Sequence, residues 1–316
     1  MKKFLLPENS IPLKANLHCH STHSDGRRTP EELKDAYKKK GYQIIAYTDH
    51  NKLVDHQDLN DEDFLALNGY EIDITENPAG VHGHNRRTCH FCLIAKKPDL
   101  PPIDLERKYD PENINAIFKR AKDAGFFVTY NHPTWSNERY PDYSKYKGMD
   151  AMEIWNTGCV RVGFDDYNCH AYQDFLTEGQ RIFCLATDDN HNAHPFGTAD
   201  CDSFGGWVVI HAEKFDYESV IAALEKGEFY ASCGPEIKAL WIEDGYVHIK
   251  TSPVHAINYI TIGRHHGTIR ANYGESVTEA VFKINPESDM FFRIDVVDDY
   301  GRHADTNAVF VDTLEL

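Results

Sequence analysis

The chain has 316 residues, 41% of them hydrophobic, which is enough for a large α/β unit plus a smaller module with its own core. Its formal net charge of -17 argues against a broad basic face for long nucleic acid or an anionic membrane. No apolar run is long enough to span a bilayer, and the eight cysteines lack the dense spacing of a secreted disulfide scaffold. We therefore expect a soluble, cytoplasmic protein with reduced thiols.

Strand candidates alternate with amphipathic helix candidates through the first two thirds of the chain. This alternation is typical of a parallel sheet or barrel wrapped by helices. N-terminal capping residues and a closing glycine predict helices within residues 29–41, 110–125 and 216–227. The expected strands lie near residues 15–19, 43–48, 69–74, 89–95, 127–131, 151–155, 182–187 and 206–211.

The first two expected strands end in metal-competent side chains. His18 and His20 end the first strand, Asp25 follows five residues later, and Asp49 and His50 end the second strand. Two histidines one residue apart on a strand point to the same side, so both imidazoles can bind one ion. Nitrogen and carboxylate ligands together suit Mn, Fe or Zn better than Ca or Mg. Some close pairs are expected by chance among 18 histidines, but two such clusters favour a metal centre.

Later strands end in similar groups. In parallel barrels the functional side chains lie at the carboxyl ends of the strands. At or near these ends the sequence places Glu71, His90, His132, Asp188, Asp189 and His191. Five or six strands with metal-competent groups at one end are hard to produce by chance, so the pattern indicates a metal-binding edge.

The pattern changes after residues 233–235, Cys-Gly-Pro. Short alternating stretches joined by turns follow, with no clear helix between them. They cover residues 239–242, 247–251, 257–262, 280–284 and 291–297. We therefore expect an α/β unit over residues 1–235 and a small all-β C-terminal domain over residues 236–316.

The ordered set of motifs resembles the polymerase and histidinol phosphatase (PHP) superfamily of metal-dependent phosphoesterases over roughly residues 14–235. The motifs are His-x-His at 18–20, Ser-Asp-Gly at 24–26, Thr-Asp-His at 48–50, Gly-Tyr-Glu at 69–71, Asn-His-Pro at 131–133 and Asp-Asn-His at 189–191. The resemblance implies a distorted (β/α)7 barrel with two or three divalent ions. Residues 205–235 resemble those members that carry an appended β module.

Carried over position by position, the resemblance implies three ion sites. One would use His18, His20, Glu71 and Asp189; a second would share Glu71 and add His90 and His132; a third would use Asp25, His50 and His191. Asp188 could replace Asp189, and His82 or His84 could replace His90. Asp25 stands where some members have a histidine, so the third site would bind more weakly or prefer Mn.

The implied activity is hydrolysis of a small phosphorylated substrate by a metal-bound hydroxide at a di- or trinuclear centre of Mn, Fe or Zn. Asp49 and His191 are candidates for catalytic proton transfer, and Asp49 could instead orient a ligand imidazole. Arg86, Arg87 and Arg161 are candidates for binding the substrate phosphate, with a solvated surface role equally open for each.

Two other functions remain open. The same metals could serve hydrolysis of a carboxylic, carbamate or aryl ester, which an apolar cavity lined by Trp135 and Phe164 would favour. Alternatively the β module binds carbohydrate or protein and the barrel is a scaffold, although the complete ligand set counts against this. Neither nucleic acid nor a membrane is expected as a partner, and the oligomeric state is left open.

Overall fold

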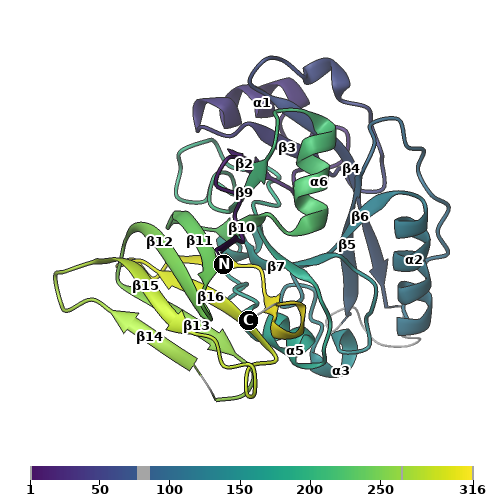
Figure 1. Ribbon diagram of the computed structural model, residues 1–316. Helices are drawn as coiled ribbons and strands as arrows, with labels where there is room; N and C mark the ends of the chain where they lie inside the picture. The colour runs from purple at the N-terminus through teal and green to yellow at the C-terminus, as the bar shows by residue number, and fades with distance from the viewer. Residues whose placement is uncertain (1, 77–85, 265, 315–316) are drawn as a thin grey trace.

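The computed structural model describes residues 2–76, 86–264 and 266–314, and over these the chain is a mixed α/β protein (Figure 1). The alternatives His82 and His84 lie outside the described residues. The helices are α1 (Pro30–Lys39), α2 (Pro111–Asp123), α3 (Tyr140–Tyr143), α4 (Thr157–Arg161), α5 (Cys169–Thr177) and α6 (Tyr217–Lys226), with 3-10 turns at Gln57–Leu59 and Val311–Thr313.

The strands of the first part are β1 (Lys3–Phe4), β2 (Ile11–Asn16), β3 (Ile44–Tyr47), β4 (Leu65–Thr75), β5 (Thr88–Ala95), β6 (Phe126–Asn131), β7 (Ala151–Asn156), β8 (Phe183–Thr187), β9 (Trp207–Ala212) and β10 (Phe229–Ser232). Those of the last part are β11 (Ile237–Glu243), β12 (Tyr246–Val254), β13 (Ala256–Thr261), β14 (His266–Arg270), β15 (Val277–Lys283), β16 (Phe291–Val297), β17 (His303–Thr306) and β18 (Val309–Phe310).

One large sheet runs through most of the described chain. Its strand order is β14-β13-β16-β17-β10-β9-β2-β3-β4-β5-β6-β7-β8, with β18 beside β16. The sheet curls, so that β8 comes close to β9 and β10. Just beyond β2 and β8, Cys19 and Asn190 form an isolated parallel bridge. The loops that follow β2 and β8 are therefore neighbours although they lie 170 residues apart in the chain.

The sheet is mixed rather than parallel. Strands β2, β3 and β4 are parallel neighbours, as are β6, β7 and β8. However, β5 is antiparallel to both β4 and β6, and β9 is antiparallel to β2. The expectation of a parallel sheet was wrong for β5 and β9. For β5 the reason is its short connection to β4, residues 76–87, because short connections most readily join antiparallel neighbours. The amino end of β5 consequently lies at the same edge as the carboxyl end of β4.

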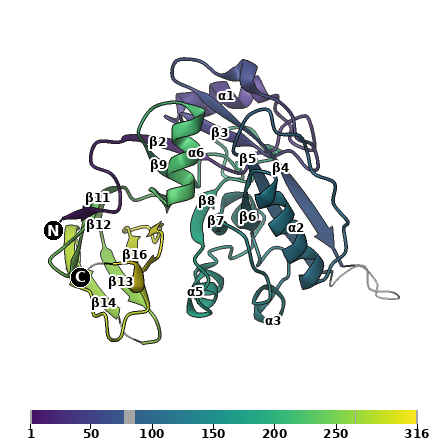
Figure 2. The ribbon, with the colours of Figure 1, turned by 45° about the vertical axis from the view of Figure 1, so that its right-hand side comes forward.

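The strands after residue 236 gather on one side of the molecule, away from α1 and α2 (Figures 1 and 2). They are joined to the rest in two ways. β17 pairs with β10, which continues the large sheet, and β1 pairs with β11 in a second sheet of order β1-β11-β12-β15. The division into units of residues 1–235 and 236–316 stays a prediction, and the residues of β1 pair across it.

The three helices expected from capping signals are present. Thr29 and Glu32 form the capping box of α1, and the side chains of Asp110 and Asp216 accept hydrogen bonds at the starts of α2 and α6. Gly227 ends α6 with a φ of 71°, in the left-handed region that glycine adopts without strain. No helix of the described chain is long and apolar enough to cross a membrane. All eight cysteines are free thiols.

Glu138 is a buried carboxyl that accepts hydrogen bonds from the hydroxyls of Tyr109, Tyr130 and Tyr146. Burial raises its pKa from 4.5 to about 7. Because the folded state holds this proton more tightly than the unfolded chain, the resulting stability is present below about pH 4.5 and is lost as the pH rises through about 7.

We expect the free energy of unfolding of the wild type, relative to that of Glu138→Gln, to fall by about 3 kcal/mol as the pH rises across that window. Urea denaturation at several pH values measures this difference. A difference that does not change with pH would contradict the assignment.

Candidate metal centre

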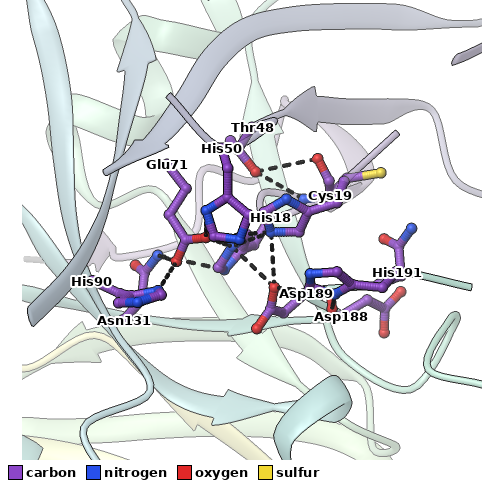
Figure 3. A network of polar contacts seen from close by, with 12 residues as sticks. His18, Cys19, Thr48, His50, Glu71, His90, Asn131, Asp188, Asp189 and His191 are labelled. Carbon is purple, nitrogen blue, oxygen red and sulfur yellow. Dashed lines mark hydrogen bonds and ion pairs between the residues drawn. The ribbon is translucent and has the colours of Figure 1, made fainter. Parts of the chain in front are cut away.

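The candidate ligands meet at one edge of the curled sheet, where their side chains point toward one another (Figure 3). Most come from the segments just beyond strand ends, but Glu71 lies within β4 and His90 near the start of β5. The antiparallel direction of β5 is what brings His90 to this edge, opposite Asn131 at the end of β6. The sequence-predicted set that the structure brings together is His18, His20, Asp25, His50, Glu71, His90, His132, Asp189 and His191.

Four buried side chains form the central group. His18 Nε2 lies 3.1 Å from Asp189 Oδ1 and 3.4 Å from Glu71 Oε2. His20 Nε2 lies 3.0 Å and 3.4 Å from the same two oxygens. Ligand atoms about 2.1 Å from a shared tetrahedral ion would stand about 3.4 Å apart. The spacing therefore suits a single divalent cation at their centre.

Glu71 links this group to a second one. Its other oxygen, Oε1, lies 2.9 Å from His90 Nδ1 and 3.3 Å from His132 Nε2. The two oxygens of one buried carboxylate are thus divided between two sets of imidazoles. Such a carboxylate can bridge two cations.

A third group lies nearer to solvent. Asp25 Oδ2 is 3.4 Å from His191 Nε2 and 3.8 Å from His50 Nε2, and 55% of the Asp25 side chain is exposed. His20 Nδ1 lies 3.7 Å from Asp25 Oδ1, so this imidazole faces two groups with its two nitrogens. The family resemblance had implied that His20 belongs to the central group alone.

The residues present fit divalent cations. Among the described residues, the buried atoms His20 Nδ1, His50 Nδ1 and Asp189 Oδ1 have no hydrogen-bond partner, although such atoms are normally satisfied. Burial raises the pKa of Glu71, but the charges of His18 and His90 outweigh it and hold that pKa well below its usual range. The centre thus presents ionised carboxylates and imidazole nitrogens, a donor set that suits Mn, Fe or Zn.

Glu153 is a residue that the sequence reasoning missed. Its oxygens lie 2.7 Å from His18 Nδ1 and from Thr187 Oγ1, 3.0 Å from the amide of His132 and 2.9 Å from Asn156 Nδ2. A carboxylate only accepts, so Nδ1 of His18 carries the hydrogen and Nε2 turns its lone pair to the centre. A buried charge within the apolar strand β7 was the signal that could have identified it.

Two ligand segments adopt backbone conformations that side-chain-bearing residues rarely use. The φ angles are 27° at His132 and 49° at Asp189. Each such residue costs on the order of 1–3 kcal/mol. The amide of Asp189 donates to the carbonyl of His18 at 2.9 Å, and the amide of His132 donates to Glu153, which hold both turns in place.

The hydrogen bonds of Asp49 join it to two serines of the loop after His20. Its carboxylate accepts four hydrogen bonds, from the amides and the hydroxyls of Ser21 and Ser24. It therefore shapes the loop between His20 and Asp25 and contacts no imidazole through a described hydrogen bond. The roles in proton transfer or in orienting a ligand imidazole that the sequence suggested for Asp49 stay predictions.

We expect Asp49→Asn to lower the free energy of unfolding by about 1–3 kcal/mol, because an amide nitrogen would face donors that now bind a carboxylate. Urea denaturation measures this, with the exposed Asp35→Asn as the matched control. Equal stabilities of the two variants would contradict the role of Asp49 in the loop.

The choice between Asp188 and Asp189 follows from their partners. Asp188 accepts from the amides of Phe204, Gly205 and Gly206 at 2.7–2.9 Å and from the hydroxyl of Tyr37 at 2.7 Å. It supports the loop before β9 and is turned away from the imidazoles. Asp189 is the carboxylate that joins them.

The arginines predicted to bind phosphate are separated by the fold. Arg87 forms ion pairs with Glu76 and Asp142 and is not among the residues that line the cavity over the metal centre, so its binding of a substrate phosphate stays a prediction. Arg86 is exposed and likewise does not line the cavity. Arg161, at the end of α4, does line it.

The cavity over the centre has a volume of about 390 Å³. Besides the candidate ligands, its walls include Trp135, Arg161, Val162, His194 and Asp202. The ring of Trp135 lies edge-on to those of His90 and His132, at 5.2 Å and 5.0 Å between ring centres. This size suits a small substrate held between the ligand cluster and a mixed polar and apolar rim.

Comparison with known proteins gives two findings at the sequence level. Residues 16–154 match the family model of the PHP domain. The DNA polymerase/3'-5' exonuclease PolX of Bacillus subtilis (strain 168) is 36% identical over an alignment of 80 residues, and the match covers 20% of this chain and 14% of that protein. The chain thus spans only a small part of this relative's length.

Three solved structures resemble the chain. A two-domain protein from Bacteroides vulgatus that contains a predicted PHP-like metal-dependent phosphoesterase has 17% identity and a TM-score of 0.48, covering 94% of each chain. A putative metal-dependent phosphoesterase from Bifidobacterium adolescentis has 15% identity and a TM-score of 0.39, covering 59% of this chain and 91% of the other. An amidohydrolase from Chromobacterium violaceum, with bound sulfate and no metal, has 15% identity and a TM-score of 0.38, covering 56% and 87%.

Proposed function

The chain matches the PHP domain family over residues 16–154, and from this match we propose that it is a metal-dependent hydrolase of small phosphoric esters. The observation that carries the proposal is the division of the two Glu71 oxygens between two groups of imidazoles. A shared carboxylate of this kind can hold two cations next to each other, as a two-metal hydrolase uses them. The ligands proposed are the nine residues brought together at the sheet edge.

Divalent ions bound there would supply an activated water nucleophile and compensate the charge that builds on the phosphoryl oxygens. The protein's own part is to hold and orient the ligand side chains and the substrate. Glu153 keeps the His18 ring in one tautomer. Asp189 and Glu71 place carboxylate oxygens 3.0–3.4 Å from the Nε2 atoms of His18 and His20. Arg161 is placed at the cavity wall to bind a substrate phosphate oxygen.

His191 has two proposed roles that depend on the number of ions. Its Nδ1 lies 3.0 Å from the carbonyl oxygen of Asp189 and donates there, which leaves Nε2 facing Asp25. With three ions bound, Nε2 is a ligand. With two, the same nitrogen can hold a proton for the leaving oxygen. Counting the bound ions therefore decides between them.

A second candidate function keeps the same centre but acts on carboxylic, carbamate or aryl esters. The supporting observation is the wall of the cavity, where Arg161 is the one described arginine and Trp135 and Val162 add apolar surface. Phe164, also expected to line an apolar cavity, is 42% exposed and lies outside the lining. The apolar part of the cavity wall is thus smaller than the sequence analysis expected for this second candidate function.

The test is turnover of phosphomonoesters, phosphodiesters and carboxylic esters by protein loaded separately with Mn, Fe(II) or Zn. We expect phosphate release that stops when a chelator removes the metal and returns when the metal is added back. Turnover of carboxylic esters alone would favour the second candidate. Equal activity of the metal-free protein would contradict both.

A further inference from the structure

A second cavity, of about 490 Å³, lies beside the metal centre across the short helix α4. Gly158, Cys159 and Val162 line the first cavity, whereas Thr157 and Val160 line the second, and Arg161 lines both. The remaining walls come from β2, the end of α1, the start of β9 and the segments at Cys233 and Arg302. None of the candidate metal ligands lines it.

Positive charge gathers in this cavity, in a protein with a formal net charge of -17. Lys14, Lys40 and Arg161 line it, and within the described part of the chain none of the three forms an ion pair with an acidic side chain. A fourth cation, Arg302, is paired with Asp298. Uncompensated cations in a concave surface focus the field and favour an anionic ligand.

Lys14 provides the strongest evidence that this cavity binds an anion. Its ammonium lies 3.8 Å from the ring centre of Trp207 and 4.1 Å from that of Tyr42, with no described hydrogen-bond acceptor. Burial is the main reason that its pKa is lowered to about 8; Asp188 and Glu236 act in the opposite direction, and the nearby Lys40 adds a smaller lowering effect. The Asp188 oxygens are already used by the amides of residues 204–206. An added anion would therefore compensate a charge that aromatic faces only partly stabilise.

Aromatic side chains lie next to these charges. Trp155, Phe204 and Trp207 line the same cavity, and the ammonium of Lys40 lies 5.6 Å from the ring centre of Phe204. Aromatic side chains beside lysine and arginine in one cavity suit a ligand that combines an aromatic ring with a negative charge. We propose that this cavity binds a small aromatic anion of the nucleoside monophosphate type.

The proposal stands apart from the proposed function, because it needs no turnover at the metal centre. The test uses calorimetric titration of the metal-loaded full chain with the phosphonate analogue of AMP, which a phosphoesterase cannot hydrolyse. We expect Lys14→Met and Lys40→Ala each to raise the Kd at this site about tenfold, the size expected for loss of one charge-assisted contact. Adenosine and inorganic phosphate should each bind more weakly than the analogue.

The matched control is Lys39→Ala, which removes the same charge one residue away on an exposed position outside the cavity. Its Kd should stay within twofold of the wild type. Lys40 is itself exposed at the end of α1, so Lys40→Ala keeps the test valid if Lys14→Met unfolds. The proposal is overturned if the analogue does not bind, if Lys39→Ala weakens binding equally, if neither cavity variant changes the Kd, or if adenosine binds as tightly.

Discussion

Asp189→Ala is expected to abolish hydrolysis by the metal-loaded protein, with kcat lowered by at least about a thousandfold. The Asp189 carboxylate lies 3.0–3.1 Å from two imidazole nitrogens of the central group, and its Oδ1 has no described hydrogen-bond partner. Removing it takes the nearer of two carboxylates away from His18 Nε2 and His20 Nε2 and leaves only Glu71 Oε2, at 3.4 Å from each. We therefore expect at least one bound ion to be lost together with the activity.

The measurement combines the rate of ester hydrolysis with the metal content of the purified variant. Asp200→Ala is the matched control, because Asp200 lines the same cavity but is exposed and belongs to none of the described ligand groups. That variant should keep its metal and a rate within a few fold of the wild type. Full metal content and full activity in Asp189→Ala would remove Asp189 from the centre.

Glu153→Gln is expected to lower the affinity for metal by about 10–100-fold and to lower kcat with it. The carboxylate accepts from four donors, including His18 Nδ1 and the amide of His132. A glutamine has only one acceptor oxygen, so its amide group must face at least one of these donors. The amide nitrogen then faces either His18 Nδ1 or the amide of His132, so one of these two segments loses its contact in either orientation, while the volume of the side chain is conserved.

Competition with a metal-binding dye measures the affinity of this variant. Thr187→Val provides the comparison, because it removes one donor to Glu153 Oε1 and leaves the contact between the carboxylate and His18 intact. Its affinity should fall less than tenfold. If both variants lose affinity equally, the contact of Glu153 with His18 does not orient the ligand.

The local part of this structure was readable in the amino-acid sequence. The starts of α1, α2 and α6 follow from Thr29, Asp110 and Asp216, because a capping residue satisfies backbone amides a few positions away in the same chain. The positions of most strands follow from apolar runs of matching length. The nine side chains expected to form the centre do lie together, since motifs at strand ends share an edge once the strands pair.

Contacts between distant segments were not readable. The direction of β5, the pairing of β1 with β11 and the ion pairs of Arg87 each depend on which segments become neighbours. Asp49 was identified from the sequence as a candidate and Glu153 was not, but for both residues the hydrogen-bond donors became known only from the structure.

The sequence by itself thus determined which residue types stand at the strand ends and that their chemistry is that of metal ligands. Only the tertiary structure decided which carboxylates face the imidazoles, which instead support loops, and which arginine reaches the cavity. The physical reason is that a ligand's identity is a property of one residue, whereas its orientation depends on packing and hydrogen bonds from segments more than a hundred residues away, as between His18 and Glu153.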